Sequence, residues 1–67
     1  MRIYYKDRKG NILKIRDYIE YNVFGNDTPN YIPRKSEKVI INKVMYIVES
    51  IVTDLDNNVI NIMLYDN

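Results

Sequence analysis

The chain has 67 residues, with neither Cys nor His, and a formal net charge of +1 from 10 basic and 9 acidic side chains. This length corresponds to one domain, residues 1–67, which buries only about 60% of the surface exposed by the unfolded chain. Without Cys or His, disulfides, thiolate metal ligands and the usual zinc and copper sites are excluded. We therefore expect association into a homo-oligomer to supplement the small core.

Charge alternates along the chain. Residues 1–16 carry +5, residues 17–33 carry −3, residues 34–43 carry +3 and residues 44–67 carry −4. The charged start lacks the apolar stretch of a signal peptide, and no run approaches the ~20 apolar residues of a membrane span. We expect a cytoplasmic protein with no membrane segment.

The first element expected is a strand at 2–6, because this stretch is rich in Ile and Tyr. The segment 7–11 follows as a hairpin connection, in which Gly10 supplies the positive φ that such loops require.

Residues 12–23 fit two patterns. With a period of two, the odd positions are apolar in five of six cases, and Asp17 is the exception. With a helical period, Ile12, Ile15, Ile19 and Val23 form a stripe. The β-rich neighbours favour a strand at 12–23, with a bend or bulge at Asp17.

The segment 25–36 contains both prolines and one of the two glycines, and we predict a long loop. Long loops in compact domains are often functional.

Residues 37–65 carry the clearest signal, which is three β-branched runs separated by Asn42-Lys43 and Asn57-Asn58. β-Branched residues favour strands, and Asn favours tight turns. The pattern predicts an antiparallel meander with strands at 37–41, 44–55 and 59–65.

Pairing about Asn42-Lys43 sets Ile41 opposite Val44 and Val39 opposite Tyr46. Pairing about Asn57-Asn58 sets Leu55 opposite Ile60, so that one face becomes the core side. The members of that face are Ile51, Thr53, Leu55, Ile60, Ile62 and Leu64.

Tyr46 and Val48 have even numbers, whereas Ile51 and Leu55 have odd numbers, so both pairs reach one core only if the strand changes parity. A β-bulge near Glu49-Ser50 makes that change with one extra residue. The resulting expectation is an all-β fold, a five-stranded antiparallel SH3-like barrel or curled meander.

The segment from Ile32 to Val39, the Tyr46-x-Val48 step and the run from Asp54 to Ile60 resemble small uncharacterised β-proteins from phages and mobile elements of low-GC bacteria. Those proteins usually place Gly where this chain has Ser36. The resemblance covers about half the chain, implies an SH3-like barrel and implies no activity.

Asp54, Asp56 and Asn58 match the opening of a calcium loop, but Val59 and Tyr65 stand where that motif needs Gly and Glu. Asp and Asn also suit hairpin turns, which is the interpretation we favour. Without His or Cys, nucleophilic triads are excluded as well. We expect no enzyme, no metal and no cofactor.

Two classes of binding function remain. The leading hypothesis is a non-enzymatic binding protein, encoded by a phage or mobile element, that occupies a host protein and inhibits, for example, a bacterial defence system. Its partner-binding residues would flank the 25–36 loop, where aromatic and basic side chains suit interfaces. They are Tyr21, Phe24, Asn30, Tyr31, Arg34 and Lys35.

The alternative is a barrel that binds nucleic acid or a nucleotide, because small barrels combine basic grooves with stacking aromatics. Its phosphate-binding residues would be Arg8, Lys9, Arg34, Lys35 and Lys38. A third hypothesis is an accessory structural protein of a phage particle.

Overall fold

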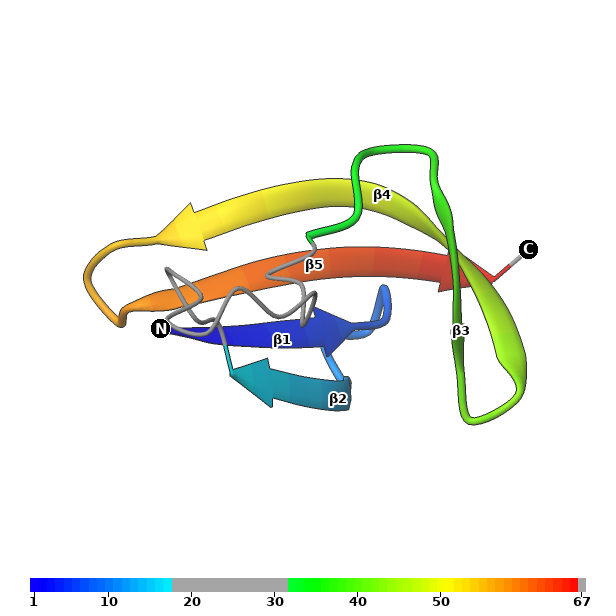
Figure 1. The fold of residues 1–67 in the computed structure, drawn as a ribbon, viewed down its shortest axis with the longest axis horizontal. Coiled ribbons are helices and arrows are strands. Elements are labelled where there is room, and N and C mark those ends of the chain that lie inside the picture. Colours follow the sequence, from blue (N-terminus) through cyan, green and yellow to red (C-terminus); the bar gives the residue numbers. More distant parts are fainter. Residues whose placement is uncertain (18–31, 67) are drawn as a thin grey trace, which may run out of the picture.

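The computed structural model describes residues 1–17 and 32–66, which form five strands (Figure 1). The all-β prediction is confirmed. The strand limits agree to within one residue, except that 18–23 lie outside the described residues. The strands are β1 (Arg2–Lys6), β2 (Ile12–Asp17), β3 (Lys38–Ile41), β4 (Val44–Asp54) and β5 (Val59–Asp66).

The strands form one curled, barrel-like sheet in the order β2-β1-β5-β4-β3. In Figure 1, β4, β5, β1 and β2 lie side by side, and β3 crosses the far end of β4. Three of the four pairings are antiparallel, but β1 and β5 run parallel. The prediction of a wholly antiparallel sheet is therefore wrong, because turn signals specify only strands that a tight turn joins.

The β3–β4 hairpin has the predicted register, with Val39 opposite Tyr46 and Ile41 opposite Val44. Asn42 and Lys43 both have positive φ, 51° and 68°. Two consecutive left-handed residues are typical of the two-residue type I′ turn, whose twist matches that of the flanking strands.

The bulge in β4 is also confirmed, since the pairing with β5 shifts register between Val48 and Ser50. Glu49 is the extra residue. Val48 pairs with Leu64 before the shift and Ile51 pairs with Ile62 after it, so even and odd positions of β4 share one face.

The register of the β4–β5 hairpin differs from the prediction by two residues. Thr53, not Leu55, pairs with Ile60, and the loop has four residues, 55–58. The Asp54 carboxylate accepts hydrogen bonds from the backbone N–H and the side-chain amide of Asn57, at 3.1 and 2.8 Å. This side-chain capping widens the turn, and Leu55 is 80% exposed instead of lying in the core.

The β1–β2 hairpin also contains a bulge, but not at the predicted Asp17. The register shifts between Tyr5 and Lys6, opposite Leu13. Beyond the shift Tyr5 pairs with Lys14, and Ile3 pairs with Arg16. Lys14 and Arg16 therefore share the inner face of the sheet with the buried residues of β1, whereas Ile12 pairs with Lys6.

The core consists of alternate residues on the inner face of four strands. Ile3, Tyr5, Ile62 and Leu64 are at most 4% exposed, and Pro33 is also fully buried. Met1, Leu13, Ile32, Val39 and Tyr46 pack around this cluster. Parallel pairing sets Ile3 beside Ile60 and Tyr5 beside Ile62, which joins the two ends of the chain in one core.

A paired substitution tests the corrected register. Ile62→Asp places a carboxylate in the fully buried centre of a small core, and we expect it to unfold the domain. Leu55→Asp should change the free energy of unfolding by no more than about 0.5 kcal/mol, because Leu55 is exposed. Urea unfolding followed by circular dichroism measures both. A large loss of stability in Leu55→Asp would instead support the predicted two-residue turn, in which Leu55 lies in the core.

The turn before β3 contains a strained residue. Ser36 has a φ of 74°, a conformation that favours Gly. The turn is held to β4 by backbone hydrogen bonds from the N–H of Ser36 to the carbonyl of Val48 and from the N–H of Val48 to the carbonyl of Glu37, at 2.8 and 2.9 Å. Gly would adopt this conformation without the steric cost that Ser has.

The two serines of the chain should respond oppositely to the same substitution. Ser36→Gly relieves a left-handed conformation and should raise the free energy of unfolding by about 0.5–1 kcal/mol. Ser50→Gly, in the middle of β4, should lower it by a similar amount. Thermal unfolding of both variants checks the signs, and two changes of equal sign would contradict the turn geometry.

Candidate functional site

Two hollows lie between the β1–β2 hairpin and the β3–β4 hairpin. The larger measures about 430 Å³ and the smaller about 180 Å³. Each has a wall from the first hairpin and a wall from the second, so we call the two together the inter-hairpin cleft.

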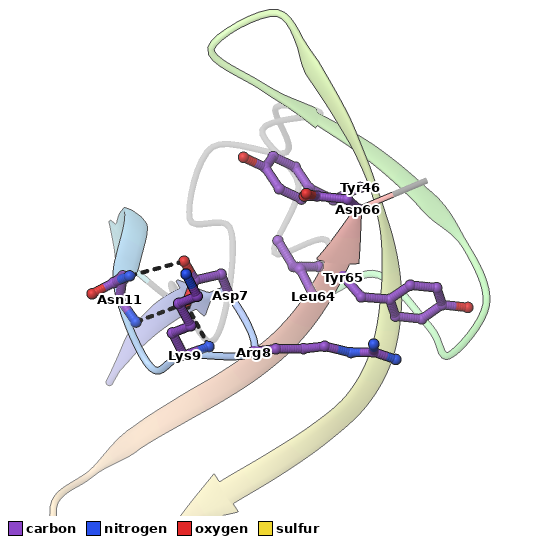
Figure 2. Close-up of a pocket in the computed structure, with 8 residues that line it drawn as sticks. All are labelled: Asp7, Arg8, Lys9, Asn11, Tyr46, Leu64, Tyr65 and Asp66. Atoms are coloured by element: carbon purple, nitrogen blue, oxygen red, sulfur yellow. Dashed lines mark hydrogen bonds between the residues drawn. The ribbon is translucent and has the colours of Figure 1, made fainter.

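The larger hollow lies at the carboxyl end of β5 (Figure 2). The loop 7–11 forms one wall, and Figure 2 shows Tyr46 and Asp66 on the opposite side. Leu64 lies between the two sides. Leu64 is fully buried, which makes the floor apolar, whereas the rim carries the charges of Lys9 and Asp66.

The loop 7–11 is ordered by the carboxylate of Asp7. Its Oδ1 accepts from the backbone N–H groups of Lys9 and Asn11, both at 2.9 Å, and its Oδ2 accepts from the Asn11 side chain at 3.1 Å. These donors, above all the Asn11 backbone N–H, hold the pKa of the Asp7 carboxyl below its ordinary value. Gly10 at φ 87° completes the turn.

Arg8 ties this loop to the bulge in β4. Its guanidinium donates to Oε2 of Glu49 at 2.9 Å and stacks 4.8 Å from the centre of the Tyr65 ring. Figure 2 shows Arg8 extended toward Tyr65 and away from Tyr46. The charge of Arg8 is therefore paired, which leaves Lys9 as the more available cation of this loop.

The smaller hollow has a basic wall and an apolar wall. Lys14 and Arg16 of β2 face Pro33 and the β3 residues Val39, Ile40 and Ile41. Arg16 donates from Nη1 to the hydroxyl of Tyr5, and its guanidinium lies 5.8 Å from the centre of the Tyr5 ring. Lys14 is exposed, and no ion pair involving its ammonium occurs in residues 1–17 and 32–66.

Four predicted partner-binding residues, Tyr21, Phe24, Asn30 and Tyr31, lie outside the described residues. The other two, Arg34 and Lys35, are exposed in the turn before β3. The backbone N–H of Arg34 donates to the Glu37 carboxylate, which fixes that turn and leaves the guanidinium outside it.

The predicted phosphate-binding residues do not share one hollow, but the segments that carry them are bound to the β4 bulge. The backbone of Val48 binds the 34–37 turn, and the next residue, Glu49, binds Arg8. Lys38 pairs with Ile47, which in turn pairs with Tyr65 beneath Arg8. Of this set, only Arg8 and Lys9 line a hollow.

The calcium-like run forms a turn. The side-chain amide of Asn57, followed by its backbone N–H, holds the pKa of Asp54 below its ordinary value. Within the described part of the chain, no three acidic side chains are grouped as metal ligands. That part also contains no helix long and apolar enough to cross a membrane.

Sequence reasoning did not single out Lys14 or Arg16 for the cleft, nor Tyr46 and Asp66. The alternation in residues 12–17 suggested an apolar odd face, but the bulge at Leu13 turns Lys14 and Arg16 inward.

The loop 7–11 should be sensitive to acid. Because the pKa of Asp7 is lowered in the folded state, its contribution to stability is present above the ordinary aspartate range, about pH 4, and is lost as the pH falls through the folded-state pKa. Asp7→Asn keeps one acceptor oxygen but does not titrate. Acid unfolding monitored by circular dichroism should therefore be shallower in Asp7→Asn than in the wild type, and identical curves would contradict this role.

Comparisons with protein-family models, with curated proteins and with solved structures find no match to this chain.

Proposed function

We propose that the chain is a non-enzymatic protein-binding module that holds an extended, acidic segment of a partner protein in the inter-hairpin cleft. The observation that carries the proposal is the smaller hollow, where the cations of β2 face the apolar side chains of β3. An occupant with one acidic and one apolar side chain would satisfy both walls.

The charge balance of the cleft favours an anionic occupant. Lys9, Lys14 and Arg16 line it together with Arg8, whose charge is paired with Glu49, against the carboxylates of Asp7 and Asp66. Asp7 is already satisfied by donors of its own loop. Lys9 and Lys14 are exposed and can approach an incoming carboxylate.

The sheet edges favour an extended occupant. β2 and β3 are the two terminal strands of the sheet, and each has one hydrogen-bonded neighbour within the described residues. Edge strands offer backbone N–H and C=O groups to an added strand, and pockets beside the edge then select side chains. The smaller hollow is such a pocket, because both edges contribute to it.

The aromatic group of the smaller hollow, Tyr5, fits a peptide better than a nucleic acid. Tyr5 is only 4% exposed and its hydroxyl is bonded to Arg16, so its ring offers no face for a base. Single-strand binding depends on such faces. The nucleic-acid function, with Arg8, Lys9, Arg34, Lys35 and Lys38 as its phosphate ligands, remains an alternative prediction.

The partner that we propose is a host protein, in keeping with the resemblance to phage and mobile-element β-proteins. Occupying an acidic strand or tail of that protein would inhibit whatever interaction the segment normally makes, as in the inhibition of a defence system. The accessory phage structural protein remains the further alternative.

The test uses a labelled peptide of alternating glutamate and valine. We expect binding by fluorescence anisotropy that weakens with added salt, because the contacts of Lys14 are electrostatic. Lys14→Glu should weaken binding by roughly tenfold or more, since it turns attraction into repulsion in the cleft. Lys35→Glu is the control, because it makes the same charge change in an exposed turn that does not line the cleft.

A lysine–valine peptide and a single-stranded oligothymidylate separate acidic specificity from general peptide affinity and from nucleic-acid binding. Equal binding of both peptides would overturn the acidic specificity. Tight oligothymidylate binding that Lys35→Glu abolishes and Lys14→Glu leaves intact would replace the proposal with the nucleic-acid function.

A further inference from the structure

The outer face of the sheet, opposite the core, has exposed apolar side chains in its central row. The members of its central row, which pair across four strands, are Ile15, Tyr4, Asn61 and Val52. Ile15 and Val52 are 48% and 52% exposed. A solvated sheet face normally carries polar side chains, so this row indicates a surface that another molecule covers.

Asn61 at the centre of this row has an unsatisfied group. Its Oδ1 is buried and has no hydrogen-bond partner, although the residue lies between Tyr4 and Val52 on the outer face. A buried acceptor without a donor is unfavourable. Rotation of the amide about χ2 would present its oxygen and its NH₂ group to a molecule that packs on this face.

Charges are distributed unevenly on the two sides of β5. Arg2 and Lys6 lie on β1, whereas Asp54 lies on β4, with β5 between them. Arg2 and Asp54 share one row, because both pair with Val59. Asp17 of β2 pairs with Arg2 in the same row, and its Oδ1 lies 3.9 Å from Nε of Arg2, with both side chains exposed. The β1–β2 side of the outer face therefore carries two cations and one carboxylate, and the β4 side at the level of Arg2 carries the carboxylate of Asp54.

This pattern is complementary to itself under one rotation. A twofold axis that runs along β5 between two facing sheets exchanges β1 with β4 and keeps each row level. Arg2 of one copy then faces Asp54 of the other, Tyr4 faces Val52, and Asn61 faces its own counterpart. An axis across the strands would instead place Arg2 over Lys6, so the charges select the first arrangement.

We propose that the outer face binds a second copy of this chain, as a face-to-face dimer with its twofold axis along β5 at Asn61. Two facing carboxamides can donate and accept reciprocally, which satisfies Oδ1 in each copy. Aligned packing of sheets about 10 Å apart is a common arrangement. A standard interface of about 800 Å² per partner would cover roughly 15% of the 5150 Å² surface.

The dimer leaves the smaller hollow of the inter-hairpin cleft open, because Tyr5, Arg16 and Val39 line it from the inner side of the sheet. The cleft residue Tyr5 and the outer residue Tyr4 are neighbours on β1 and point to opposite faces. Dimerisation and peptide binding can therefore be tested separately.

Sedimentation equilibrium of the wild type should give twice the monomer mass of 8.1 kDa at high micromolar concentration. Val52→Lys puts a charge opposite Tyr4 of the second copy and should weaken dimerisation by roughly tenfold or more. Leu55→Lys is the matched control, since it introduces the same charge at an exposed apolar site in the β4–β5 turn. It should dimerise like the wild type.

The absence of Cys permits a direct test of the axis. Asn61→Cys should be joined to its own copy by a short bismaleimide at low micromolar protein, whereas Leu55→Cys should not. A wild type that stays at monomer mass would overturn the dimer. A wild-type dimer in which Asn61→Cys does not cross-link, or in which Val52→Lys associates normally, would overturn this face as the interface. Far-UV circular dichroism confirms that each variant is folded.

Discussion

The parallel pairing of β1 with β5 is the constraint on which the rest of the structure depends. Each hairpin can form from local turn signals, but neither encloses a core by itself. The pairing places Ile3 beside Ile60 and Tyr5 beside Ile62, and these residues are the centre of the only core cluster in the described chain. It also sets the two hairpins on either side of β5, which creates the cleft between them.

After this pairing, the bulge at Glu49 has the largest effect on the arrangement of the strands. It allows Val48 and Ile51 to share a face, so β4 can bend and carry β3 across the end of the sheet. At the bulge, the backbone of Val48 binds the 34–37 turn, and the side chain of Glu49 binds Arg8. One extra residue therefore fixes the curvature, the position of the second wall of the cleft and the position of the 7–11 loop.

The sequence predicted those parts of the fold that depend on neighbouring residues. The register about Asn42-Lys43 followed from turn chemistry, and the bulge followed from a parity conflict in one strand. The predicted position of Leu55 was wrong because the Asp54 carboxylate accepts hydrogen bonds from Asn57, which makes the turn four residues long. The direction of β1 relative to β5, and the inward turn of Arg16 after the bulge at Leu13, depend on packing between distant segments, which a local pattern does not encode.

The position of β5 in the middle of the sheet also has a consequence for the folding rate. Ile3 and Ile60 are neighbours in space, yet they are separated by nearly the whole chain. The entropy of closing so long a loop must be lost before their contact is gained, and sheets with such distant pairings fold slowly for their size. Substitutions at the β1–β5 contact should then alter the folding rate, whereas those in the β3–β4 turn should act chiefly on unfolding.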